Sequence, residues 1–63
     1  MKLYVWHDSL RDYTAGVMFA LANSVEEARE MILQDCSYVP KWELDREPTV
    51  YDSPYGCVVW GGG

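Results

Sequence analysis

The apolar residues of this chain fall into four short runs and one helical pattern. Residues 3–6 and 17–22 are compact apolar runs of strand length. Residues 49–52 and 57–60 are two further strand-like segments, rich in β-branched and aromatic side chains. The order of these runs predicts two strands before the helix and two after it.

The segments between paired runs predict two hairpins. Residues 7–15 carry no period of either kind, so they predict a long loop between the first two strands. Residues 53–56 read Ser-Pro-Tyr-Gly, and proline second with glycine fourth suits a type I turn. Residues 49–52 and 57–60 are therefore predicted to form a second hairpin around this turn.

A helix is predicted in the middle of the chain. Ser24 and Glu27 match a capping box, in which each side chain satisfies a free amide at the helix start. Pro40 disfavours helical geometry at the preceding residue, so the helix should end between residues 35 and 37. Its apolar positions recur every three or four residues, which predicts an amphipathic helix lying on a sheet: Val25, Ala28, Met31, Ile32 and Cys36.

Together these elements predict one small α+β domain over residues 1–63. We expect a mostly antiparallel four-stranded sheet, in the order strand-strand-helix-strand-strand, with one helix packed on one face. Trp42 and Leu44, in the charged stretch 41–47, are expected to fold over the core edge. Because strand neighbours alternate faces, one helix cannot cover both apolar sides. The uncovered face is predicted to be an interaction surface.

Size and charge narrow the possible partners. A domain of 63 residues has a small core that usually needs further support, and a two-fold homo-oligomer is expected to supply it. Ten acidic and five basic residues give a net charge of −5, which repels phosphate backbones. Nucleic acid is therefore not an expected partner. The acidic residues are spread along the chain, so a DNA-mimicking face is not indicated either.

The start of the chain and its two cysteines together predict a reducing compartment. The start of the chain lacks the apolar run of a signal peptide, which predicts a cytoplasmic protein with Cys36 and Cys57 as free thiols. His7 stands far from both cysteines, so no metal or other cofactor is expected. No apolar stretch approaches the roughly 20 residues that cross a bilayer, so no membrane association is expected.

The candidate chemistry favours binding over catalysis. His7, Asp8 and Ser9 are the residue types of a hydrolase triad, but triads are assembled from residues distant in sequence. The glutamates of the predicted helix lie on a solvent face without the burial that tunes a pKa. The chain is therefore not expected to be an enzyme. Side chains of the long loop could bind a partner or serve as turn residues.

Three tryptophans are many for so short a chain, and each could be either core or interface. Trp60 ends the last predicted strand and is followed by glycines; it is favoured as an interface anchor because one helix cannot cover two apolar sheet faces. Those three glycines form a flexible tail or dock against a partner. The expected partner-binding residues are Trp6, Asp8, Asp12, Tyr13 and Trp60.

Residues 3–16, 24–29 and 59–63 together resemble small hypothetical proteins encoded by bacteriophages. The resemblance implies expression in the cytoplasm of an infected bacterium, where many short acidic phage proteins act by binding. The leading hypothesis is a non-catalytic inhibitor of a host protein, such as a component of an antiviral defence system. The alternative is an oligomeric protein that sequesters a small nucleotide signal, which requires Arg11, Arg29 or backbone amides to converge on a phosphate.

Overall fold

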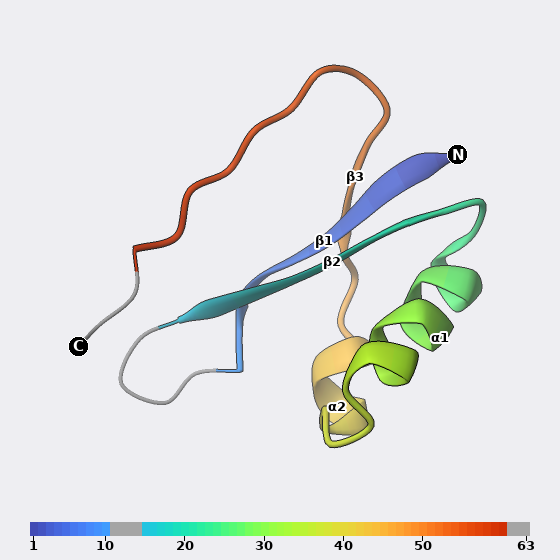
Figure 1. Ribbon diagram of the computed structural model, residues 1–63, viewed down its shortest axis with the longest axis vertical. Coiled ribbons are helices and arrows are strands. Elements are labelled where there is room, and N and C mark those ends of the chain that lie inside the picture. The colour runs from blue at the N-terminus through green and yellow to red at the C-terminus, as the bar shows by residue number, and fades with distance from the viewer. Residues whose placement is uncertain (11–14, 61–63) are drawn as a thin grey trace.

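A three-stranded sheet with two helices on one side makes up the described part of the chain. The computed structural model describes residues 1–10 and 15–60. Its elements, which Figure 1 labels, are β1 (Lys2–Ser9), β2 (Gly16–Ala22), α1 (Val25–Asp35), α2 (Lys41–Leu44) and β3 (Thr49–Tyr51). The α+β class predicted from the sequence is confirmed.

The sheet is antiparallel throughout and has the order β2-β1-β3, so the first strand of the chain is the central one. The predicted fourth strand is wrong, because residues 57–60 form no strand in the described structure. The ring of Tyr55 stacks on that of Tyr51 at a centroid distance of 3.6 Å. This stacking directs the chain over a face of the sheet, so it does not return beside β3 as the second predicted hairpin required.

The start and end of α1 agree with the prediction. The backbone amide of Glu27 donates to the Ser24 hydroxyl at 3.1 Å, and the Glu27 carboxylate accepts from the Asn23 amide at 2.8 Å. The helix ends at Asp35. Cys36 was predicted on the apolar face of the helix, which is wrong: it is the C-cap, has an extended backbone and is exposed.

The core lies between α1 and one face of the sheet. On this face Tyr4 of β1 stands opposite Ala20 of β2. The small Ala20 side chain beside the large Tyr4 ring leaves room for α1. Leu44 closes the core from α2, as expected, but Trp42 is 66% exposed, so its predicted place over the core is wrong. The buried apolar cluster comprises Tyr4, Trp6, Met18, Ala20, Ala22, Ala28, Ile32, Val39 and Leu44.

The other side of the sheet carries a third layer. Figure 1 shows the chain after β3 running along the side of the sheet opposite to the two helices. We call residues 52–60 the C-terminal segment. Within residues 1–10 and 15–60, neither helix has the length and apolar character needed to cross a membrane.

Candidate functional site

β1 continues beyond the point where the sequence predicted a loop. It extends to Ser9, and its register with β2 shifts between Trp6 and Ser9, which marks a bulge. Asp8, inside the bulge, has a positive φ of 52°. The predicted loop of residues 7–15 therefore starts too early, because this irregular stretch remains part of the strand.

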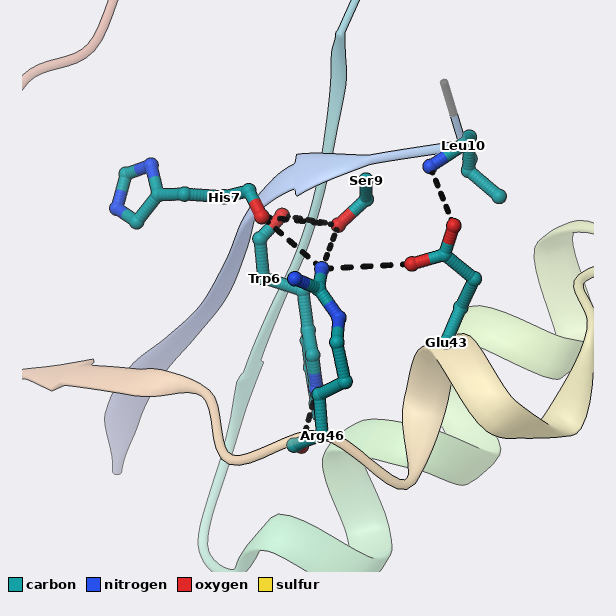
Figure 2. Close-up of polar contacts among 6 residues, drawn as sticks. All are labelled: Trp6, His7, Ser9, Leu10, Glu43 and Arg46. Atoms are coloured by element: carbon teal, nitrogen blue, oxygen red, sulfur yellow. Dashed lines mark hydrogen bonds and ion pairs between the residues drawn. The ribbon is translucent and has the colours of Figure 1, made fainter. Parts of the chain in front are cut away.

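Arg46, which is distant in sequence and follows α2, stabilises the bulge. Its Nη2 atom donates to the His7 carbonyl at 2.9 Å and to the Ser9 hydroxyl at 2.7 Å, and that hydroxyl donates to the Trp6 carbonyl at 2.6 Å (Figure 2). The Trp6 indole in turn donates to the Arg46 carbonyl at 2.9 Å. These bonds satisfy carbonyl groups at the place where the strand register breaks.

Glu43 completes the cluster and is only 3% exposed. One carboxylate oxygen lies 3.4 Å from Arg46 Nη2, and the other accepts from the Leu10 amide at 2.9 Å (Figure 2). Leu10 has a positive φ of 54°, so Glu43 helps to hold an uncommon backbone conformation. The cluster joins α2 to the end of β1, and its role is to stabilise the fold.

The three adjacent triad-type residues make separate contacts. Ser9 is fully buried and bonded to Arg46 and Trp6. The Nε2 atom of His7 instead lies 3.1 Å from the Tyr51 hydroxyl oxygen and 3.3 Å from that of Tyr55. His7 and Ser9 are therefore engaged with different partners and not with each other's side chains.

His7, Tyr51 and Tyr55 form an aromatic clasp that fixes the C-terminal segment to the sheet. Both tyrosine rings meet the imidazole edge to face, with centroid distances of 6.2 and 6.4 Å. A side-chain hydrogen bond with Tyr51 is the main cause that raises the pKa of Tyr55 above its ordinary value. The clasp sets the point where the segment leaves β3.

Beyond the clasp, the segment only partly covers the outer face, by which we mean the side chains of Leu3, Val5, Val17, Phe19 and Leu21. A hollow of about 270 Å³ remains between this face and the segment. Val5 is buried, whereas Phe19 and Leu21 of β2 are 65% and 60% exposed. Two large apolar side chains thus face solvent side by side along one strand, which is the main candidate for a binding surface.

The predicted binding residues lie in different environments in the structure. Trp6 is 1% exposed and belongs to the core, so its ring is not available to a partner. Asp8 is exposed, and Trp60 is 86% exposed at the end of the C-terminal segment. Asp12, Tyr13 and the glycine tail lie outside the described residues.

Sequence reasoning missed the residues that shape the site. Phe19 and Leu21 are two positions apart in the apolar run 17–22, so a period of two places both on one face of the strand, but the sequence does not say which face the helix covers. Nothing in the sequence around Tyr51 and Tyr55, beyond their aromatic character, indicates that their rings stack.

In the described parts of the chain, no group of three or more His, Cys, Asp or Glu side chains could hold a metal ion. Comparisons of the chain with protein-family models, curated proteins and solved structures found no match.

Proposed function

We propose that this chain is a non-catalytic protein-binding domain and that the outer face is its binding surface. The observation that carries the proposal is the exposure of Phe19 and Leu21, at 65% and 60%, next to the apolar C-terminal segment. Exposed apolar patches of this kind mark interaction sites in small proteins, and aromatic side chains within them are frequent anchors.

The proposed partner is a protein of an infected bacterial host, such as a component of an antiviral defence system, which the chain would inhibit by binding. The resemblance of residues 3–16, 24–29 and 59–63 to small phage proteins supports this choice. The net charge of −5 supports a protein partner over a nucleic acid. An inhibitor of this kind needs a binding surface and no catalytic group.

The alternative, sequestration of a nucleotide signal, has less support. The Arg29 guanidinium donates to the Leu44 carbonyl at 2.7 Å, and Arg46 is bonded within the bulge cluster. These two cations therefore already serve the fold. Arg11, the other arginine named for this alternative, lies outside the described residues.

The test is affinity capture from a lysate of infected bacteria, followed by a direct binding measurement with the purified partner. Phe19→Asp places a charge in the proposed interface and should weaken binding by at least about 2 kcal/mol. Trp42→Asp is the matched control, since Trp42 is equally exposed but lies on α2, across the sheet from the outer face. Absence of a stoichiometric partner, or equal binding by both variants, would contradict the proposal.

Trp60 provides a second test of the same surface. Because its ring is 86% exposed, Trp60→Ala should leave the circular dichroism spectrum and unfolding midpoint unchanged. As an anchor, the ring should contribute about 2 kcal/mol to partner binding. If Trp60→Ala binds the partner as tightly as the parent protein, Trp60 is not part of the binding surface. The role of Phe19 is tested by Phe19→Asp.

A further inference from the structure

A second surface lies along β2, at the edge of the sheet. In the sheet order β2-β1-β3 the described residues pair β2, a strand of seven residues, on one side only. The other side presents a row of backbone amides and carbonyls that can pair with another strand. β3, the opposite edge, has only three residues and offers much less backbone for pairing.

A groove of about 500 Å³ follows this free edge. It is lined by consecutive residues of β2, from Val17 to Leu21, and by Met31 and Ile32 of α1. Because successive side chains of a strand point to opposite faces, a groove lined by consecutive residues runs along the edge and not over one face. An edge strand flanked by a helix is the geometry in which proteins accept an added strand.

The chain itself contains a segment suited to this groove. Residues 57–60, Cys-Val-Val-Trp, have strand-forming side chains but pair with no strand in the described structure. Val58 and Trp60 are mostly exposed. Gly56, immediately before them, has no neighbouring atom within 4 Å of the position of a Cβ, so the chain has room to pivot there. The aromatic clasp can therefore stay closed while residues 57–60 move.

Charge selects this segment over another copy of β2. All 15 charged side chains fall within residues 2–52, so the chain after Asp52 is uncharged. Asp35 lines the groove. If β2 of a second copy paired there, it would bring its own α1 and a second set of acidic side chains toward Asp35. An uncharged strand adds no such repulsion.

We propose that residues 57–60 of one copy add as a strand to the β2 edge of a second copy, forming a strand-exchanged dimer. Each copy then gives one segment and receives one, so a two-fold arrangement closes. In this dimer the free backbone groups of the β2 edge pair with the added strand, and the exposed Val58 and Trp60 become buried. This inference concerns a different partner, a second copy of the chain, and its groove shares Val17, Phe19 and Leu21 with the outer face.

The two native cysteines provide a direct test. Cys36 lines the groove and Cys57 belongs to the added segment, while Figure 1 places the end of α1 and the C-terminal segment on opposite sides of the sheet. Both are free and exposed. We take the added segment to run parallel to β2: α1 begins beside the end of β2, so Cys36 lies toward the Val17 end of the groove, where Cys57 of the other copy then lies.

The experiment mixes the full-length Cys36→Ser and Cys57→Ser variants under mild oxidation and maps disulfides by mass spectrometry. The expected result is a Cys36–Cys57 bond between different chains, at several times the dimer yield of either variant alone. Equal yields in the mixture and in the separate variants would overturn the proposal.

Sedimentation of the unmodified protein gives an independent measurement. The proposal predicts a dimer that Val58→Lys in the segment and Met31→Lys in the groove each weaken at least about tenfold. Trp42→Lys, which lies outside the groove, should leave the dimer unchanged. A strict monomer at high micromolar concentration, or a dimer insensitive to Val58→Lys, would overturn the exchange. In particular, the second result would point to pairing between two β2 strands.

Discussion

Removing the Arg46 guanidinium should destabilise the fold far more than removing an ordinary surface cation. In Arg46→Met the His7 carbonyl and the Ser9 hydroxyl lose their shared donor, and Glu43 becomes a buried carboxylate without its ion-pair partner. Two hydrogen bonds to a charged group contribute about 1.5 kcal/mol each, so the expected loss is about 3 kcal/mol. Because the Arg46 side chain of the pair is 39% exposed, the low end of the range for breaking a buried ion pair applies, and it gives the same figure.

That loss is large for a domain of this size. If the parent protein has about 4 kcal/mol of stability, the variant retains about 1 kcal/mol, and roughly one molecule in seven is unfolded at 25 °C. With a urea dependence of about 1 kcal/mol per molar, the unfolding midpoint falls from about 4 M to about 1 M. Urea titration followed by far-ultraviolet circular dichroism measures this shift.

Lys41→Met is the matched control for this experiment. Lys41 pairs with Asp45 at 3.1 Å, but both side chains are exposed, so the pair should contribute less than about 0.5 kcal/mol. A double-mutant cycle between Arg46→Met and Ser9→Ala should show coupling of at least about 0.5 kcal/mol. If Arg46→Met moves the urea midpoint no more than Lys41→Met does, the Arg46 cluster does not stabilise the fold.

Three further substitutions test other parts of the fold by the same urea titration. Gly16→Ala should cost about 1 kcal/mol, because a Cβ there would lie 3.1 Å from the Ser9 carbonyl oxygen; an unchanged midpoint would show that the strand yields freely. Ser24→Ala removes the cap of α1 and should cost about 1 kcal/mol, whereas no loss would mean that water replaces the cap. Leu44→Ala should cost about 3 kcal/mol because the side chain is buried, and a cost below about 1 kcal/mol would argue against its place in the core.

The parts of the fold that sequence predicted are those with local causes. The capping pair Ser24 and Glu27 is three residues apart, and Pro40 acts on its immediate neighbour, so both ends of α1 were predictable. The first hairpin followed from two apolar runs. Each of these signals is contained within a short window of the chain.

The parts that sequence did not predict depend on contacts between distant residues. Arg46 and Ser9 are 37 positions apart, and Glu43 looks like a solvated surface acid until the bulge of β1 covers it. The course of residues 57–60 depends on the stacking of Tyr55 on Tyr51, which overrides the strand tendency of that segment. Local propensity identified the right residue types but not their tertiary partners.

The proposed function places the binding of a protein partner on the outer face of the sheet. Amide chemical shifts of the labelled chain, recorded with and without the purified partner, test it most directly. The perturbed amides are expected to cluster at Leu3, Phe19 and Leu21 and to continue into the C-terminal segment. Perturbations confined to the acidic surface of α1, on the other side of the sheet, would contradict it.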